Sequence, residues 1–329
     1  MKKIALVGPF HQKICDAFAA GIPEGFELIK VNNRDDYSAI SDADFIINRT
    51  FKLNADDVRN AKKLKLVQKW GAGYDNIDAE GIGRLDIPVA VCSGINAQPV
   101  AELAVLHMLA VLRNITALNT HLKNNLWPRE EYISRSYLLG GRVVGLVGLG
   151  NIGKKVAALV QAFGCRVVYY DPFRVPVETE KTLDVEYLPL DGLLKIADVV
   201  SLHLPLTSDT KNLIDYAKLS IMKPTAILIN TSRGGIVDEN DLARAIAENK
   251  IMGAGLDALA CEPIGQDSPL IGLERVNMTP HIGGNTVDND GNMVARCLDN
   301  ILRIDKGCPL RRKDLVNLNS LTTKMEVEE

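Results

Sequence analysis

The sequence predicts an α/β protein built from two doubly wound parallel-sheet domains. The chain has 329 residues, and a prior of roughly 100–200 residues per domain favours two domains over one. Short apolar runs alternate with amphipathic segments, which is typical of repeated strand–helix units. This rhythm starts twice, once at the N-terminus and again near Arg142.

The first part of the chain contains the elements of one complete α/β unit. Its apolar runs predict strands at residues 3–7, 27–31, 44–48, 64–68 and 89–91. Amphipathic spacing predicts helices near residues 11–20, 56–61 and 78–84. Because short strands alternate with helices, we expect a parallel sheet with helices on both faces.

A long helix is predicted from about Gln98 to Lys123, with Pro99 in its first turn. Its run VAELAVLHMLAVL is apolar nearly all round, which predicts burial between domains or subunits. His107 lies inside this run, and we interpret it as a packed core residue.

The second unit repeats the same order of elements. Strands are predicted at residues 142–147, 165–170, 199–203, 226–230, 253–256 and 276–278, and a helix at about 285–306. The tail from 311 to 329 is polar and weakly patterned, so we expect it to pack loosely. If the last helix returns to the first unit, one domain comprises residues 1–97 plus about 286–329, and the other comprises 98–285.

Composition and charge exclude several classes of partner. The formal net charge is −3 and the isoelectric point is about 6.0, so we expect no nucleic acid and no membrane as partners. The apolar run at the N-terminus is too short for a signal peptide, and no run is long enough for a membrane span. The six cysteines are scattered without a Cys-x-x-Cys pair, which favours reduced thiols and a cytoplasmic location. No histidine or cysteine spacing predicts a metal site.

A glycine motif after the predicted strand at 142–147 indicates a dinucleotide site. Gly148, Gly150 and Gly153 form the pattern Gly-x-Gly-x-x-Gly, with Asn151 and Ile152 at the start of the next helix. The glycines permit a tight turn, a close approach of the backbone to a pyrophosphate, and close packing of helix on strand. The helix N-terminus then presents unpaired N–H groups to the phosphates.

Asp171 ends the next predicted strand, about 20 residues after Gly150, where an acidic residue binds the ribose 2′-hydroxyl of NAD. A carboxylate about 4 Å from a 2′-phosphate would cost roughly 4 kcal/mol per charge pair at an effective dielectric constant near 20. We therefore expect NAD (NADH) as the cofactor and NADP as less favoured, although Arg174 offers a partial offset.

Further polar residues follow the other strands of this unit, where ligands of open α/β sheets bind. They are His203 and Pro205, Thr231 and Arg233, Asp257 and Glu262, and His281. Three of them suit the reduction of a 2-keto acid. His281 can exchange a proton near neutral pH, and Glu262 can orient the imidazole ring and stabilise its protonated form. Arg233 can bind a carboxylate and polarise a carbonyl.

Each of these side chains also has a structural interpretation. Arg233 can be a solvated turn residue, Glu262 a loop charge, and His281 a structural residue between Pro280 and two glycines. For His203, packing near the cofactor is favoured over proton chemistry.

The chain resembles the D-isomer-specific 2-hydroxyacid dehydrogenase family, whose members include D-lactate, D-3-phosphoglycerate and glyoxylate/hydroxypyruvate enzymes. The motifs that carry the resemblance stand in the family's order and cover nearly the whole chain. They are GAGYDNID (71–78), NAQPVAEL (96–103), GLGNIG (148–153), HLPLTSDTKNLI (203–214), INTSRGGIVDENDL (229–242), GLDALACEP (255–263) and TPHIGG (279–284).

The resemblance implies a Rossmann NAD-binding domain and a flavodoxin-like substrate domain with a cleft between them. It implies a D-2-hydroxy acid/2-keto acid substrate and a homodimer joined through the cofactor domain. It implies a catalytic trio of Arg233, Glu262 and His281, and cofactor contacts from Asp171, Thr231 and Asp257. It also implies that the backbone N–H groups of Gly71, Ala72 and Gly73 bind the substrate carboxylate.

Two points stay open at this stage. Arg49, after the third strand, would favour a second anionic group such as a phosphate if it reaches the substrate, while Trp70 is as well explained by packing. The main alternative function is an NAD(H)-binding, corepressor-like regulatory protein with little turnover. Formate dehydrogenase is another enzyme candidate, but the first domain lacks the extra length expected for it.

Overall fold

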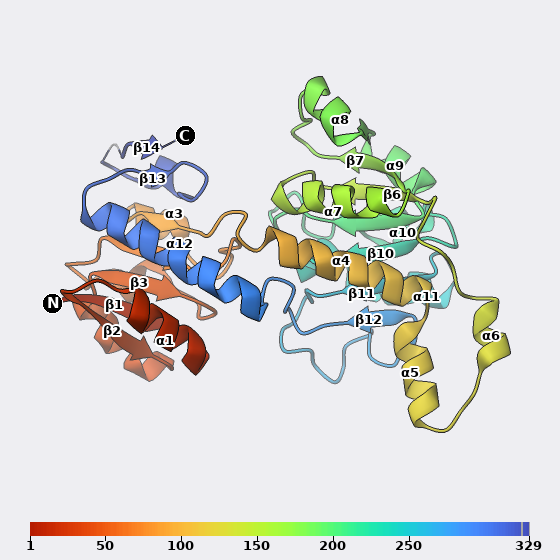
Figure 1. Cartoon of the computed structure of the whole chain (residues 1–329), viewed down its shortest axis with the longest axis horizontal. Coiled ribbons are helices and arrows are strands. Elements are labelled where there is room, and N and C mark those ends of the chain that lie inside the picture. Colours follow the sequence, from red (N-terminus) through yellow and green to blue (C-terminus); the bar gives the residue numbers. More distant parts are fainter. Residues whose placement is uncertain (324, 329) are drawn as a thin grey trace. The chain divides into compact units, whose positions relative to one another are not determined.

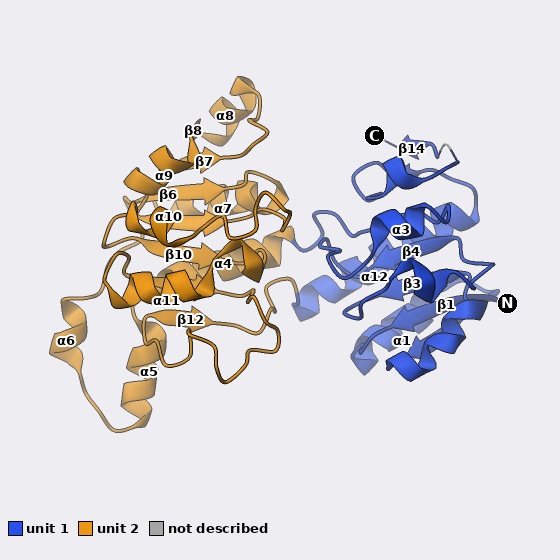
Figure 2. Cartoon of the chain, turned by 180° about the vertical axis from the view of Figure 1, so that it is seen from behind, with its two compact units in different colours: residues 1–96, 285–329 blue, residues 97–284 orange. Residues whose placement is uncertain are grey.

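A computed structural model describes residues 1–323 and 325–328 of the chain. The chain divides into two compact units, which are coloured separately in Figure 2. Unit 1 comprises residues 1–96 and 285–329, and unit 2 comprises residues 97–284.

Unit 1 contains a five-stranded sheet in which every strand pair is parallel. Its spatial order is β2-β1-β3-β4-β5, which is the flavodoxin-like order. The strands are β1 (Lys2–Val7), β2 (Phe26–Val31), β3 (Phe45–Asn48), β4 (Leu66–Lys69) and β5 (Val89–Ala90). The predicted doubly wound sheet is confirmed here.

Helices cover both faces of this sheet and form two separate apolar cores (Figure 1). One face packs against α1 (Gln12–Gly21) and α12 (Val287–Asp305), through Phe18 and Ile301 among others. The other face packs against the 3₁₀ helix η1 (Arg34–Asp42), α2 (Ala55–Val58) and α3 (Ala79–Gly83).

Unit 2 contains a seven-stranded parallel sheet in the order β12-β11-β10-β9-β6-β7-β8. Its first six strands in the chain have the Rossmann order 3-2-1-4-5-6, and β12 extends the sheet. The strands are β6 (Val143–Val147), β7 (Arg166–Tyr170), β8 (Val185–Tyr187), β9 (Val199–Leu202), β10 (Ile227–Asn230), β11 (Gly253–Leu256) and β12 (Val276–Met278). The loops after β6 and β9 meet at the point where the strand order reverses, which is where such sheets bind ligands.

Two apolar cores cover the faces of this second sheet as well. One contains α4 (Ala97–Leu112) and α7 (Asn151–Ala162). The other contains α9 (Leu190–Ile196), α10 (Tyr216–Ser220) and α11 (Glu239–Ala247). The remaining helical segments are α5 (Ile115–Lys123), α6 (Arg129–Ile133), α8 (Val177–Leu183) and the 3₁₀ helix η2 (Gly234–Ile236).

The predicted continuous helix over 98–123 is wrong, because the chain bends by 62° between α4 and α5. Asn114 has a left-handed backbone with a φ of 52°, and its side-chain amide donates to the carbonyl of Arg135. An asparagine tolerates this conformation better than most residues do, so it ends one helix and starts the next. Of the described helices, none alone is long and apolar enough to cross a membrane; only the bent pair α4 and α5 reaches that length and composition jointly.

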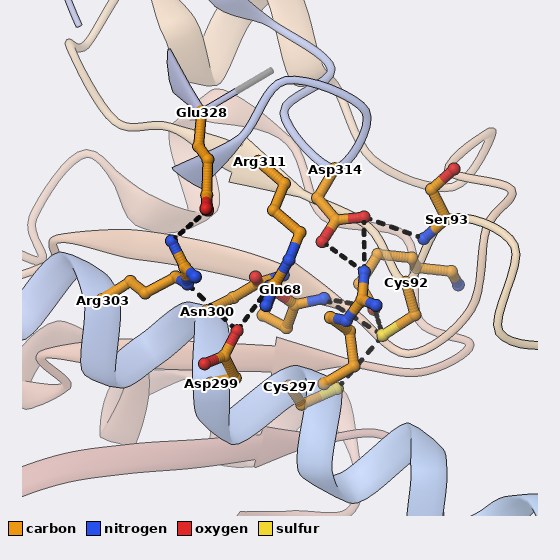
Figure 3. A network of polar contacts seen from close by, with 12 residues as sticks. Gln68, Cys92, Ser93, Cys297, Asp299, Asn300, Arg303, Arg311, Asp314 and Glu328 are labelled. Carbon is orange, nitrogen blue, oxygen red and sulfur yellow. Dashed lines mark hydrogen bonds and ion pairs between the residues drawn. The ribbon is translucent and has the colours of Figure 1, made fainter. Parts of the chain in front are cut away.

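The expectation of a loosely packed tail is also wrong (Figure 3). Asp314 is fully buried and forms an ion pair with Arg296 at 2.9 Å. Asn317 is buried too, and its amide binds the backbone of Ala79, Ile87 and Val89. A polar segment packs tightly here because each buried polar group has a partner. The tail elements are β13 (Leu310–Arg311), η3 (Leu318–Ser320) and β14 (Val327–Glu328).

Candidate active site

In the glycine loop of unit 2, the backbone packs so closely that two positions have no room for a Cβ atom. Gly148 has a φ of +102°, and a Cβ atom there would lie 2.5 Å from the carbonyl oxygen of His203. A Cβ atom on Gly153 would lie 2.3 Å from the carbonyl oxygen of Gly148. Gly150, in contrast, has no atom within 4 Å of its Cβ position. The loop is therefore packed on its protein side and open at Gly150.

Helix α7 begins directly after this loop, at Asn151, with Ile152 partly buried behind it. No side chain of the described residues caps this helix. Its first N–H groups and their partial positive charge are therefore available to an anion, as the sequence predicts.

Asp171 follows β7 and is tied to the glycine loop. One of its carboxylate oxygens accepts the N–H of Leu149 at 2.9 Å, and the other accepts the N–H of Phe173 at 2.9 Å. Arg174 points its charge elsewhere, because its guanidinium binds Glu180 through two nitrogens at 2.7 and 2.9 Å. Hydrogen bonds from Arg174 and Tyr169 lower the pKa of Glu180 to about 2, so this pair persists across the neutral range.

Two buried polar atoms beside the loop have no partner among the described residues: Nδ1 of His203 and Oγ1 of Thr231. His203 Nε2 contacts the hydroxyl of Ser201 at 2.9 Å, and burial lowers the pKa of His203 to about 3. The ring is therefore neutral at any physiological pH, which favours packing beside the cofactor over proton chemistry. Pro205 lies two residues further along the same loop and is exposed.

Arg233 follows β10 in a turn that Asn230 builds. The side-chain amide of Asn230 donates to the carbonyl of Arg233 at 2.8 Å, and its oxygen accepts the N–H of Ser232 at 3.0 Å. Next in the chain is Gly234, where a Cβ atom would lie about 2 Å from the backbone of Leu259. This close approach packs the Arg233 turn against the loop that carries Glu262.

Glu262 and His281 are paired. His281 Nδ1 lies 2.9 Å from one carboxylate oxygen of Glu262 and 3.1 Å from the other. Burial alone raises the pKa of the Glu262 carboxyl, but the hydrogen bonds from His281 and Leu259 and the charge of Arg233 together hold it below its usual range. Glu262 is therefore a carboxylate at neutral pH, with the guanidinium of Arg233 close enough to stabilise its charge.

The turn that carries His281 is held by Asp257, which is 2% exposed. His281 has a left-handed backbone, with a φ of 52°, and its N–H donates to the carbonyl of Asp257 at 2.9 Å. The Asp257 carboxylate accepts the N–H groups of Ile282 at 2.9 Å and Gly283 at 2.8 Å. These bonds hold the histidine in a backbone conformation that is uncommon for residues other than glycine.

The predicted substrate loop lies in unit 1, at the carboxyl end of β4. Gly71 has a φ of +123°, and its carbonyl accepts the N–H of Cys92 at 2.8 Å. In the described part of the chain, the N–H groups of Gly71, Ala72 and Gly73 donate to no acceptor. Three neighbouring free N–H groups form an arrangement that suits a carboxylate.

Arg49 lies at the point of unit 1 where the strand order reverses, after β3. One guanidinium nitrogen donates to the carbonyl of Pro9, and the group lies 5.8 Å from the centre of the Phe10 ring. Lys69 also donates to the carbonyl of Arg49. Trp70 is 7% exposed and packs on Phe10 and other core residues, which agrees with its structural interpretation.

Sequence reasoning assigned no role to Thr279 and placed His107 only in the core. In the structure, Thr279 Oγ1 lies 2.6 Å from the Asp257 carboxylate and 3.1 Å from His107 Nε2. The position of Thr279, two residues before His281, could have marked it as a candidate site residue. Its contact with His107, about 170 residues earlier in the chain, was not visible in the sequence. No group of three or more metal-ligating side chains is present in the described residues.

Comparison with known proteins decides the family. A family model described as "D-isomer specific 2-hydroxyacid dehydrogenase, NAD binding domain" matches residues 105–283. The chain is 37% identical over 280 residues to a glyoxylate reductase of Thermococcus litoralis, covering 83% of each chain. The chain belongs to the D-isomer specific 2-hydroxyacid dehydrogenase family.

Other family members and a solved structure show the same relationship. A D-3-phosphoglycerate dehydrogenase of Methanocaldococcus jannaschii is 37% identical over 92% of this chain, and this chain spans 58% of that longer protein. An NAD-dependent formate dehydrogenase from Staphylococcus aureus, solved with NAD, superposes with a TM-score of 0.84 at 27% identity. This chain covers 99% of that structure, so length does not separate it from a formate dehydrogenase, contrary to the expectation from sequence.

As a member of the 2-hydroxyacid dehydrogenase family, the protein is an NAD-dependent oxidoreductase. The residues of unit 2 fit the cofactor: the loop is open at Gly150, and among the described residues no side chain caps α7 and none pairs with the buried hydroxyl of Thr231. When bound, NAD supplies the nicotinamide carbon that gives or accepts a hydride.

Proposed function

We propose that this enzyme interconverts a small 2-keto acid and the corresponding D-2-hydroxy acid, with His281 as the acid/base. In the direction of reduction, C2 of the keto acid accepts a hydride and its oxygen accepts the proton that His281 holds. Glu262 orients the ring and stabilises its protonated form. Arg233 binds the substrate carboxylate and polarises the carbonyl through its planar fork.

The observation that supports this proposal is the pair formed by His281 and Glu262, with Arg233 electrostatically coupled to the same carboxylate. Since Nδ1 faces Glu262, we assign the proton exchange with substrate to the other ring nitrogen of His281, Nε2. The free N–H groups of Gly71, Ala72 and Gly73 provide a second set of donors for the carboxylate. Asp257 and Thr231 contribute to the nicotinamide side of the site.

The substrate identity is tested by following NADH consumption with glyoxylate, hydroxypyruvate, pyruvate, 3-phosphohydroxypyruvate and branched keto acids, and NAD reduction with formate. Rapid reduction of one or more keto acids supports the proposal. A preference for the phosphorylated acid would assign Arg49 to a second anionic group. Turnover of formate alone would contradict the proposed substrate class. Tight NADH binding without any turnover would support the corepressor-like alternative, which the named reductases and dehydrogenases among the relatives do not favour.

We also propose that NADH is preferred over NADPH, because Asp171 carries a negative charge at the predicted ribose position and Glu180 holds the neighbouring Arg174. Replacing Asp171 by asparagine removes the charge and keeps a hydrogen-bond acceptor. The ratio of kcat/KM for NADH to that for NADPH should fall by about 10- to 100-fold, because loss of a charged hydrogen bond and relief of repulsion act together. Arg174→Ala is the matched control, and its ratio should stay unchanged. A wild-type enzyme that uses NADPH more efficiently would contradict the proposal.

We infer that the protein forms a homodimer through unit 2. Large apolar side chains between α4 and β6 are exposed, and Trp127 is 77% and Leu138 73% exposed. The others in this segment are Ile115, Leu122, Leu126 and Ile133, and Leu106 is exposed on α4 itself. Helices α5 and α6, which carry several of them, contact each other through His121 and Tyr132. So many exposed apolar side chains in one segment favour association. Sedimentation equilibrium should give twice the chain mass, and a monomer at micromolar concentration would contradict the inference.

A further inference from the structure

A chain of three hydrogen-bonded side chains, two of them buried, connects helix α4 to the turn that carries His281. His107 is 3% exposed, and its Nε2 lies 3.1 Å from Oγ1 of Thr279. The same hydroxyl lies 2.6 Å from the carboxylate of Asp257. Asp257 in turn accepts the backbone N–H of His281 through its carbonyl, and those of Ile282 and Gly283 through its carboxylate. The path from His107 to the active-site turn therefore lies within unit 2.

The direction of these hydrogen bonds follows from the number of protons available. An ionised carboxylate only accepts, so the Thr279 hydroxyl must donate its one proton to Asp257. The oxygen of that hydroxyl is then left as an acceptor, and His107 must donate through its Nε2–H. A neutral histidine in this tautomer orients the hydroxyl toward Asp257. Leucine or methionine at position 107 would leave the hydroxyl without its donor.

The hydrogen-bonded chain from His107 to Asp257 requires glycine at two positions, because a Cβ atom at either would be too close to it. A Cβ atom on Gly255 of β11 would lie 2.7 Å from the Cβ atom and 3.1 Å from Nδ1 of His107. A Cβ atom on Gly283 would lie 2.8 Å from the Asp257 carboxylate. The first glycine lets α4 pack close enough for His107 to reach Thr279. The second lets the active-site turn close onto Asp257.

We propose that His107 is a positioning residue of the active site, which holds the His281 turn in its reactive conformation through Thr279 and Asp257. The inference rests on the proposed role of His281, since positioning matters for the rate only if that ring exchanges a proton. The Asp257 carboxylate accepts three donors, from Thr279, Ile282 and Gly283, and three donors orient a carboxylate better than two. The left-handed backbone of His281 depends on these bonds. His107 itself does not exchange protons with substrate, because its ring is buried and burial lowers its pKa.

The test uses the full chain with NADH and the keto acid that the panel above shows to be reduced fastest. His107→Leu removes the donor with little change in volume, and His107→Gln keeps a donor. Loss of one buried hydrogen bond corresponds to about a five- to tenfold change, and we expect that loss in kcat with the NADH dissociation constant within about twofold. His107→Gln should recover most of kcat. Val111→Ala, on the same helix beside Gly253, is the matched packing control and should lower the melting temperature while leaving kcat within about twofold.

A double-mutant cycle separates positioning from simple destabilisation. Thr279→Val removes the hydroxyl through which His107 acts, so His107→Leu should change kcat by less than about twofold in that background. If the fold losses in kcat from His107→Leu and Thr279→Val multiply in the double variant, the two residues act independently and the proposal is overturned. An unchanged kcat in His107→Leu would overturn it as well. If His107→Leu does not fold, the comparison of His107→Gln with His107→Met gives the same contrast of donor and no donor.

Hydrogen–deuterium exchange of the peptide around residues 279–286 provides a readout that does not depend on turnover. It should be faster in His107→Leu than in Val111→Ala, since only the first substitution loosens the bonds to Asp257. Equal protection in both variants would contradict the proposal even if both enzymes were slow. If His281 is not the acid/base, the exchange difference remains while the effect on kcat disappears, so failure of the proposed function and failure of this inference give different results.

Discussion

Replacing His281 by asparagine should slow keto-acid reduction by about 10²- to 10⁴-fold, the usual contribution of a general acid, while NADH binding changes by less than about threefold. Asparagine is the informative substitution because residue 281 has a left-handed backbone, which asparagine adopts more readily than alanine does. The turn held by Asp257 should therefore survive, and the variant should lack only the titratable ring. The measurement is steady-state NADH oxidation together with NADH fluorescence titration.

A control and a partner variant make this result specific. His11→Asn, at an exposed histidine of unit 1, should reduce the keto acid at the wild-type rate. Unchanged turnover by His281→Asn would remove His281 from the mechanism. Glu262→Gln should keep measurable activity but change its pH dependence. Because Glu262 is ionised at neutral pH and stabilises the protonated ring, its loss should move the midpoint of the falling limb of reduction to lower pH. A profile with an unmoved midpoint would show that the pair has no electrostatic role.

The sequence predicted most of the fold because the hydrophobic periodicity of buried parallel strands is strong. The strand predicted at 44–48 is β3 (Phe45–Asn48), and all four of its residues are buried. The prediction missed β8 (Val185–Tyr187), which has three residues and pairs only with β7 at the sheet edge. A strand of that length buries too little on either face to produce a periodic signal.

The two wrong predictions about the fold, the continuous helix and the loose tail, had causes that act through tertiary contacts. The break at Asn114 depends on a hydrogen bond to Arg135, and the apolar composition of the helix gave no sign of it. The tail packs because the partners of Asp314 and Asn317 lie in α12 and in the chain around α3 and β5. A polar sequence is compatible with burial when such partners exist, and periodicity alone does not reveal them.

The candidate site shows the same division between local and distant information. Motifs next to strand ends predicted Arg233, Glu262 and His281, and the structure brings these side chains together, although their roles stay predictions. The connection from His107 to Thr279 joins positions far apart in the chain, and a buried histidine in an apolar helix looks like any core residue in sequence. Only the three-dimensional structure assigns it a polar partner.

Replacing Arg233 by lysine should lower kcat/KM for the keto acid by about 10²- to 10³-fold, even though the positive charge is kept. A guanidinium presents two parallel N–H donors to a carboxylate, whereas an ammonium presents a point charge without that geometry. Removing one partner of a buried, charged hydrogen-bonded pair costs roughly 2–5 kcal/mol, or about 30- to 5,000-fold, and lysine, which keeps the charge but loses the paired donors, should fall within that range. NADH binding should change by less than about threefold, because we expect the glycine loop and α7 to bind the cofactor independently of Arg233.

The matched control is Arg244→Lys, which changes an exposed arginine of α11 paired with Glu248 at the end of the same helix and should leave kcat/KM within about twofold. A second measurement compares keto acids with the corresponding uncharged ketones. The wild-type enzyme should prefer the acid strongly, and Arg233→Lys should lose most of that preference, since the discrimination comes from the carboxylate contact. If Arg233→Lys reduces the keto acid as efficiently as the wild type, the arginine is a turn residue.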